Sequence, residues 1–341
     1  MEIGLYTFAD MTPDPATGRM IGVEQRFAEI LAAAELADQA GLAVYAFGEH
    51  HRLDIAISSP AIMMAAVAAR TKRLRVASAV TILSTLDPVR VFEDFATVDL
   101  ISGGRAEIIA GRGTFVESFP LFGASLDDYD ALFTEKLDLL LKLSAAERVT
   151  WEGRFRSPLI DAEISPRPVQ NPLPIWIGTG GNAGNAASAA RLGLPLTLAN
   201  ITLPPANLAP QIRDYQRIGA EAGFGPDRIR VGLAGHMHVG ETSQGARDEF
   251  YPYYARYFLL HAPKKSYARE IPRDEYDKRA AADGPIFVGS PQEIVDKILW
   301  ERELFGHQRY LGQIDIGGLP FARVARTIEL LEAKVLPALK V

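Results

Sequence analysis

Two adjacent histidines follow a glutamate in the stretch FGEHHRLD, which covers residues 47–54. An imidazole exchanges protons near neutral pH and is also a common metal ligand, so His50 and His51 are candidates for acid–base catalysis or metal binding. Successive residues of a β-strand point to opposite faces, so the two rings diverge unless the strand has already ended. A structural role, in which each ring is hydrogen-bonded within the fold, is the alternative.

Metal binding would need further ligands from elsewhere in the chain, because a zinc site uses at least three at fixed geometry. The sequence has 6 histidines and no cysteine, which excludes thiolate ligands, disulfides and a cysteine nucleophile. His236 and His238 form an H-x-H pair that could join His50. A metal-dependent hydrolase is therefore an alternative, although no tight ligand pattern assigns a metal site.

A glycine-rich turn, IGTGGNAGN at residues 177–185, has the composition of an anion site. Glycines let the backbone approach an anion, and free N–H groups at the start of a helix, here near Asn182 or Asn185, can bind it. The turn is neither a Walker loop nor a dinucleotide-binding fingerprint, because the required lysine and glycine spacing are absent. Arg112, in the GRG of residues 111–113, would add a cation. A plain strand–helix turn is the alternative.

The elements that must position these residues alternate between apolar runs and amphipathic helical patterns. Helices are indicated by apolar spacings of three and four residues, by glycine stops, and by Asp87-Pro88, an N-cap acid before a first-turn proline. The eight strand candidates are residues 2–8, 42–50, 74–83, 105–111, 173–178, 194–200, 229–239 and 309–315. A helical pattern follows each strand, so the sequence predicts an α/β fold, a (β/α)8 barrel with insertions, as a single domain over residues 1–341.

Two stretches interrupt this alternation. VTWEGRFR, residues 149–156, is typical of a β-hairpin with a Glu-Gly turn, and the prolines after it predict an irregular segment. A hairpin and an irregular excursion are thus expected near 148–173. Residues 261–288 are charged and contain three prolines that would break any regular element. They are interpreted either as an active-site lid or as a disordered surface insertion.

In a (β/α)8 barrel the active site lies at the C-terminal ends of the strands. That rule brings GEHH, GRG and GTGGN together at the barrel mouth. Alternation from the small residues Ala46 and Gly48 predicts that His50, rather than His51, faces the barrel interior. Glu49 then lies on the helix side, where it would anchor the end of the strand.

Composition bears on partners and location. The formal net charge is −6 and no dense Lys/Arg run occurs, which argues against a nucleic-acid partner. The N-terminus lacks the basic and apolar regions of a signal peptide. No apolar run reaches the roughly 18–20 residues that span a bilayer. We therefore expect a soluble, cytoplasmic protein with no membrane partner.

At this point several stretches together resemble the bacterial luciferase-like flavin monooxygenases. The matching stretches are GEHH, SSPAIMMAAVAARTKRLRVASAVTIL, LDPVRVFEDFATVDLISGGRAEIIAGRG, FPLFGASLDDYDALFTEKLDLL, PIWIGTGG and FVGSPQEIVDKIL. They span most of the chain, and the order and spacing of EHH, DPVR, SGGR and GRG are specific to the family.

The resemblance implies a flavin bound at the barrel mouth and assigns site residues. His50 would act beside the flavin, and a non-proline cis peptide at Ala79–Val80 would support its ring. The flavin phosphate would be held by the residues at the ends of strands 4 and 5, which are Arg112, Gly113, Gly180, Gly181 and Asn182. One departure is Asp130, which stands where the luciferases carry a second phosphate-binding arginine; it leaves a deazaflavin open as cofactor.

The activity that the resemblance implies is a monooxygenase using reduced FMN and O2. With no separate dinucleotide-binding domain in the chain, reduced FMN would come from a partner reductase. Tyr6, Phe8 and Phe115 would form the apolar part of a site for a small organic substrate, whose identity the sequence leaves open. A deazaflavin-dependent hydride-transfer enzyme and a flavin-binding protein without turnover are alternatives. A homodimer is expected from the resemblance and from the apolar helix around Met63, Met64 and Val67.

Overall fold

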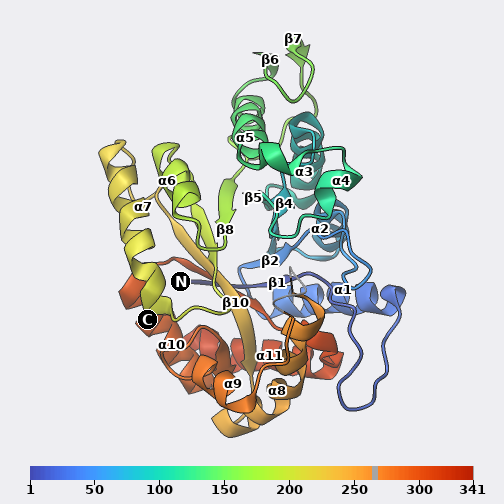
Figure 1. Ribbon diagram of the computed structural model, residues 1–341, viewed down its shortest axis with the longest axis vertical. Coiled ribbons are helices and arrows are strands. Elements are labelled where there is room, and N and C mark those ends of the chain that lie inside the picture. Colours follow the sequence, from blue (N-terminus) through green and yellow to red (C-terminus); the bar gives the residue numbers. More distant parts are fainter. Residues whose placement is uncertain (263–267, 341) are drawn as a thin grey trace.

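Eight parallel strands close into a barrel in the part of the chain that the structure, a computed structural model, describes: residues 1–262 and 268–340 (Figure 1). They are β1 (Glu2–Thr7), β2 (Val44–Phe47), β3 (Arg75–Ser78), β5 (Ala106–Gly111), β8 (Ile175–Thr179), β9 (Leu196–Ala199), β10 (Val231–Val239) and β12 (Arg309–Gln313). The barrel is closed because β12 pairs with both β1 and β10, while β9 pairs with β10. The predicted (β/α)8 barrel is confirmed, strand by strand.

Helices cover the outside of the barrel (Figure 1). The longer ones are α1 (Val23–Gln39), α2 (Pro60–Arg70), α3 (Pro88–Ser102), α5 (Tyr129–Ala145), α6 (Ala183–Arg191), α7 (Ala209–Glu221), α8 (Ser243–Leu260), α10 (Pro291–Phe305) and α11 (Phe321–Leu330). The shorter elements are α4 (Ser118–Leu121), α9 (Arg273–Arg279), α12 (Leu336–Ala338), β4 (Thr81–Ile82), β11 (Phe287–Gly289), the 3-10 turns η1 (Leu126–Asp128), η2 (Pro205–Leu208) and η4 (Ile316–Gly318), and the π turn η5 (Leu331–Val335). The α3 boundaries follow the sequence signals: the Asp87 carboxylate accepts the Val89 N–H at 2.8 Å, and Gly103 ends the helix with φ 68°.

Alternation along the strands separates two apolar regions. Inside the barrel, Ala46, Ala77 and Ile109 belong to one buried cluster. Tyr45 and Phe47, on the other face of β2, belong to the larger core between the strands and the helices. The predicted facing of β2 is therefore confirmed, and residues that continue its inner face point into the mouth.

Charged side chains close the N-terminal end of the barrel interior. The buried Arg309 guanidinium donates to the Glu107 carboxylate at 2.6 Å and to the Glu2 carboxylate at 2.7 Å. Its central carbon lies 4.3 Å from the Trp176 ring centre. Burial raises the pKa of Glu2, but Arg309 and Arg75 outweigh burial and lower that pKa to about 2. The barrel floor is thus charged, and its charges are paired.

The hairpin near residue 150 differs from the prediction. Its strands are β6 (Arg148–Trp151) and β7 (Leu159–Glu163), joined by residues 152–158 rather than by a tight Glu-Gly turn. The reason lies in α5, where the Glu135 carboxylate accepts the N–H groups of Arg154 and Phe155, each at 2.8 Å. Those bonds hold the connection against the helix, so the second strand starts only at Leu159.

The stretch 261–288 is partly regular. Residues 263–267 lie outside the described residues. The expectation that prolines would exclude regular structure is wrong for 273–279, which form α9, because Pro272 stands just before the first turn, where its missing N–H costs nothing. The buried ring of Tyr276 attaches α9 to α8, because its centre lies 5.3 Å from that of the Tyr254 ring. An active-site lid over this stretch stays a prediction.

The apolar face of α2 is used within the chain. Met63, Met64 and Val67 are all buried in the main core, so this face covers the barrel and gives no support to a dimer. The homodimer itself stays a prediction that light scattering can test. Among the described helices, none combines the length and the apolar character that crossing a membrane would require.

Removing the arginine from the barrel floor should destabilise the fold. Arg309→Met removes the nearer and fully buried of the two arginines that pair with Glu107, which then keeps only Arg75 at 3.3 Å. Breaking a buried pair costs about 3–5 kcal/mol of unfolding free energy. Urea denaturation followed by circular dichroism measures the loss. The control Arg323→Met removes an exposed arginine paired with Glu249 and should cost less than about 1 kcal/mol. Equal losses in the two variants would contradict this role for Arg309.

Candidate active site at the barrel mouth

His50 lies at the mouth, two residues beyond the inner-facing Gly48 of the segment after β2. Only 8% of it is exposed. Its ring meets the rings of Phe8 and Phe115 edge-on, at centroid distances of 4.8 and 4.7 Å. Its Nδ1 lies 3.6 Å from the Glu117 carboxylate and has no hydrogen-bond partner among the described residues. An apolar box with one carboxylate therefore surrounds an imidazole that retains hydrogen-bonding capacity.

His51 points elsewhere because Glu49 holds it. The buried Glu49 carboxylate contacts His51 Nε2 at 3.0 Å and accepts the Ile82 N–H at 2.8 Å. The His51 ring also meets Phe122 edge-on at 4.9 Å. Glu49 thus ties the end of β2 to β4, as the sequence predicted, and the two histidines have different surroundings.

Glu117 was not anticipated from the sequence. Burial raises the pKa of its carboxyl, but His50 and Arg52 outweigh burial, and the pKa falls below its ordinary value. The Arg52 guanidinium lies 4.9 Å from the Phe115 ring centre and pairs with Asp54 at 2.7 Å. No short-range pattern links Glu117 to His50, because they meet only when the loops after β2 and β5 are brought together.

The peptide bond between Ala79 and Val80 is cis, at the position that the family resemblance implied. The Val80 side chain fills the space above two neighbouring strands. A Cβ added at Gly111 or at Gly178 would stand 2.5 Å from a Val80 methyl group. Both positions therefore require glycine, because Val80 approaches them so closely. The backbone of β3, β5 and β8 forms a tightly packed wall of the mouth.

Arg112 follows β5 and lies next to the glycine-rich turn, because Ala110 of β5 is the register partner of Ile177 of β8. Its guanidinium carbon lies 5.1 Å from the Tyr129 ring centre, and the Tyr129 hydroxyl donates to the Gly113 carbonyl at 2.7 Å. Arg112 also forms an ion pair with Asp130. The arginine is 87% buried by its surroundings, whereas the Asp130 side chain is 79% exposed.

The glycine-rich turn opens toward unfilled space. A Cβ on Gly180 or Gly181 would meet nothing within 4 Å, and Gly181 has φ 98°. Asn182 caps α6 by accepting the Asn185 N–H at 3.0 Å. Among the described residues the N–H groups of Ala183 and Gly184 find no partner. This exposed backbone, with Arg112 beside it, has the donors that a phosphate group needs.

The aromatic wall includes the residues that the sequence suggested. Tyr6 lies 5.5 Å from Phe8, which in turn contacts His50, and Phe115 closes the other side. Burial, with Asp10 and Asp315 nearby, raises the pKa of Tyr6, so its hydroxyl stays protonated at neutral pH. The wall is apolar and can exclude water from a bound ring or substrate.

The three histidines of the metal hypothesis do not converge. His238 contacts the Glu249 carboxylate at 2.9 Å and stacks on Phe250 at 5.2 Å. The ring of His236 meets that of Tyr257 at 4.9 Å, and burial, with a smaller effect from Arg279, lowers its pKa to about 3. Among the described residues no group of three His, Cys, Asp or Glu side chains could hold a metal ion.

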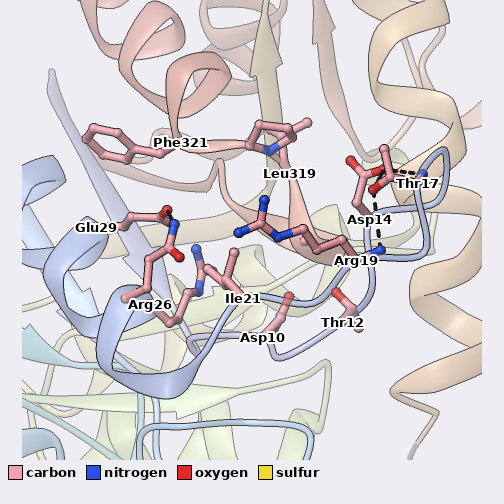
Figure 2. A pocket seen from close by; sticks show the side chains of 13 residues that line it. Asp10, Thr12, Asp14, Thr17, Arg19, Ile21, Arg26, Glu29, Leu319 and Phe321 are labelled. Carbon is pink, nitrogen blue, oxygen red and sulfur yellow. Dashed lines mark hydrogen bonds between the residues drawn. The ribbon is translucent and has the colours of Figure 1, made fainter.

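A separate cavity of about 390 Å³ lies on the rim between the loop after β1, the first turns of α1 and the segment before α11. Figure 2 shows the Arg19 guanidinium reaching across it between Leu319 and Ile21. Below it, Arg26 is buried and donates to the Asp315 carboxylate at 2.8 Å. This ion pair attaches α1 to the segment that follows β12. The sequence patterns did not predict the cavity.

A closed (β/α)8 barrel with a histidine, an aromatic wall and an anion-binding turn at its C-terminal rim is the architecture of an α/β-barrel enzyme. A family model described as luciferase-like monooxygenase matches residues 1–308, and the chain belongs to this family of oxidoreductases. The similarity thus covers all the mouth residues described above.

Solved structures support the same assignment. Monooxygenase RslO1 from Streptomyces bottropensis is 28% identical, with 99% of each chain covered and a TM-score of 0.86. The oxygenating constituent of 3,6-diketocamphane monooxygenase from Pseudomonas putida, in complex with FMN, is 20% identical over 99% of this chain and 98% of that one, with a TM-score of 0.79. A coenzyme F420-dependent tetrahydromethanopterin reductase from Methanopyrus kandleri is 17% identical over 98% of both chains, with a TM-score of 0.74. The last two similarities show the fold alone.

Glu49→Ala should loosen the end of β2 without touching the aromatic wall. Leaving the buried Ile82 N–H unpaired costs about 1–3 kcal/mol of unfolding free energy, and hydrogen exchange at the Ile82 amide should accelerate. The control Glu24→Ala changes an exposed residue at the start of α1 and should leave that exchange unchanged. Unaltered exchange at Ile82 in Glu49→Ala would show that Glu49 does not hold the strand end.

Proposed function

We propose that this protein is a flavin-dependent monooxygenase that uses reduced FMN and O2 to oxidise a small organic substrate. The observation that carries the proposal is a buried His50 inside an aromatic box, with an open glycine-rich turn at the same barrel rim, in a chain of the luciferase-like monooxygenase family. The FMN complex of the Pseudomonas putida enzyme, which shares this fold, adds support for the cofactor.

The cofactor would lie along the mouth between two groups of residues. Arg112, Gly113 and the turn of Gly180, Gly181 and Asn182 would hold the phosphate through one guanidinium and free backbone N–H groups. The Ala79–Val80 wall would support the ring system. When bound, reduced flavin supplies the electrons that activate O2; the protein's own part is to orient both reactants and exclude water.

His50 would hold or transfer a proton next to the reacting atoms. Its Nδ1 has the Glu117 carboxylate at 3.6 Å, so the carboxylate can orient the ring. Tyr6, Phe8 and Phe115 would contact the substrate. Their apolar surface favours a small apolar or carbonyl compound.

The second candidate function is hydride transfer with a deazaflavin. Two observations favour it: the Arg112–Asp130 ion pair, which opposes a strongly charged phosphate, and the shared fold with an F420-dependent reductase. Mass spectrometry of the cofactor that copurifies with the protein decides between FMN and a deazaflavin.

We also propose that a separate reductase supplies reduced FMN, since the described chain is a single barrel and the Pseudomonas putida structure is named as an oxygenating constituent only. A cytoplasmic location and a homodimer belong to the same proposal. The location rests on the N-terminal sequence and on the lack of a long apolar run, and the homodimer rests on the family resemblance.

The activity is tested by supplying reduced FMN, a panel of small ketones, aldehydes and terpenes, and 18O2. We expect a product that contains one 18O atom, detected by mass spectrometry. O2 consumption that ends entirely in hydrogen peroxide across a broad panel would indicate a flavin-binding protein without turnover. An absence of O2 consumption, together with a deazaflavin in the purified protein, would favour hydride transfer.

The two histidines should differ in effect. With reduced FMN saturating, His50→Ala should lower the rate of product formation by roughly 100- to 10,000-fold, as expected for loss of a general acid–base group. His51→Ala should lose less, because its ring is paired with Glu49 outside the aromatic box. Circular dichroism checks that both variants fold. Equal small losses of rate in the two variants would show that both histidines have only a structural role.

Arg112→Ala should weaken FMN binding selectively. A charge-assisted contact to a phosphate contributes on the order of 1.5–3 kcal/mol, which corresponds to roughly a tenfold to hundredfold loss of affinity. Riboflavin lacks the phosphate, so its affinity should change little. Fluorescence titration measures both ligands. If both lose affinity to the same extent, Arg112 supports the mouth structurally and does not contact phosphate.

A further inference from the structure

The Arg112 guanidinium already has a negative partner in the protein. It forms an ion pair with the Asp130 carboxylate, in the first turn of α5, and the ring of Tyr129 covers it at 5.1 Å. Asp130 is exposed and has no other ion-pair partner in the described part of the chain. A carboxylate therefore occupies the position next to Arg112 that an incoming phosphate would use.

Two more carboxylates lie near this corner of the mouth, one of them paired with an arginine. Asp127 and Asp128 precede α5 in η1, and Asp128 pairs with Arg154 at 3.0 Å. Arg112 is joined to this corner by its ion pair with Asp130, and it follows β5, the strand that pairs with β8 before the glycine-rich turn. A doubly charged phosphate bound at Arg112 would thus stand beside the Asp130 carboxylate. Two neighbouring negative charges repel each other even where solvent screens them.

We propose that Asp130 sets the affinity and specificity of the mouth for phosphate by competing with the ligand for Arg112. The inference rests on the proposed function, because it concerns the phosphate of the flavin. Binding of the phosphate requires the Arg112–Asp130 ion pair to be loosened, which offsets part of the gain from the new contact. The consequence is a weakened preference for FMN over riboflavin and easier exchange of the cofactor with a partner protein.

The opposite role for Asp130 is to hold Arg112 in its binding position. The two roles predict opposite changes in the affinity for phosphate when the Asp130 charge is removed. If Asp130 competes, removing its charge strengthens phosphate binding; if it positions Arg112, removing the charge weakens it. Tyr129 supports the guanidinium independently, through the ring contact and its own bond to the Gly113 carbonyl at 2.7 Å. Arg112 therefore keeps a scaffold when Asp130 is neutral.

The test compares Asp130→Asn with a matched control, Asp127→Asn, in the full-length protein. Both substitutions remove one negative charge from the same exposed segment, but Asp127 has no ion pair with Arg112. FMN and riboflavin affinities are measured by fluorescence titration at low and at high salt. We expect Asp130→Asn to bind FMN about tenfold more tightly at low salt, less so at high salt, with riboflavin changed by less than about twofold. Asp127→Asn should show a smaller gain.

Weaker or unchanged FMN binding by Asp130→Asn overturns the proposal, as does an equal gain for both flavins. Inorganic phosphate, titrated calorimetrically on the same variants, separates this inference from the proposed function. If wild-type protein binds neither flavin, the proposed cofactor is wrong. Tighter phosphate binding by Asp130→Asn would still support competition at Arg112, and unchanged phosphate binding would overturn it.

Discussion

The mouth of this barrel depends on one buried carboxylate, that of Glu49. By accepting the Ile82 N–H and contacting His51, it fixes the end of β2 against β4 and turns the second histidine of the pair away from the interior. The inner-facing alternation of β2 then continues to His50. A buried carboxylate needs such partners because it loses the hydration it would have in water. The chemistry available at the mouth thus follows from how a strand end is anchored.

A second constraint is the close packing around Val80. Its methyl groups occupy the space that side chains at Gly111 and Gly178 would need, so three neighbouring strands meet with almost bare backbone. Arg112 comes one residue after Gly111, and the Gly180–Gly181 turn begins two residues after Gly178. Because β5 and β8 pair in parallel, the two segments emerge from neighbouring strands. Rigid packing below and open backbone above suit a site that must position a large planar ligand precisely.

Much of this could be predicted from the sequence. All eight strands and the helix starts at Asp87 and Asn182 followed from alternation, β-branched runs and capping residues, because these signals are local. The hairpin itself is present, but its tight Glu-Gly turn was wrong, because a distant carboxylate, Glu135, holds the connection between the two strands. Glu117 and the Arg112–Asp130 ion pair were missed for a related reason: each joins loops that only the closed barrel brings together. α9 was missed because a proline was taken as a breaker where it starts a helix.

The central claim is that His50 and the Arg112 corner face the same bound flavin, with His51 excluded. A crystal structure of the protein with FMN tests it most directly. We predict the phosphate between Arg112 and the Gly180–Asn182 turn, the Arg112–Asp130 contact lengthened, and the His50 ring against the isoalloxazine beside Ala79–Val80. A flavin whose phosphate lies away from Arg112, or whose ring meets His51 in place of His50, would contradict the claim.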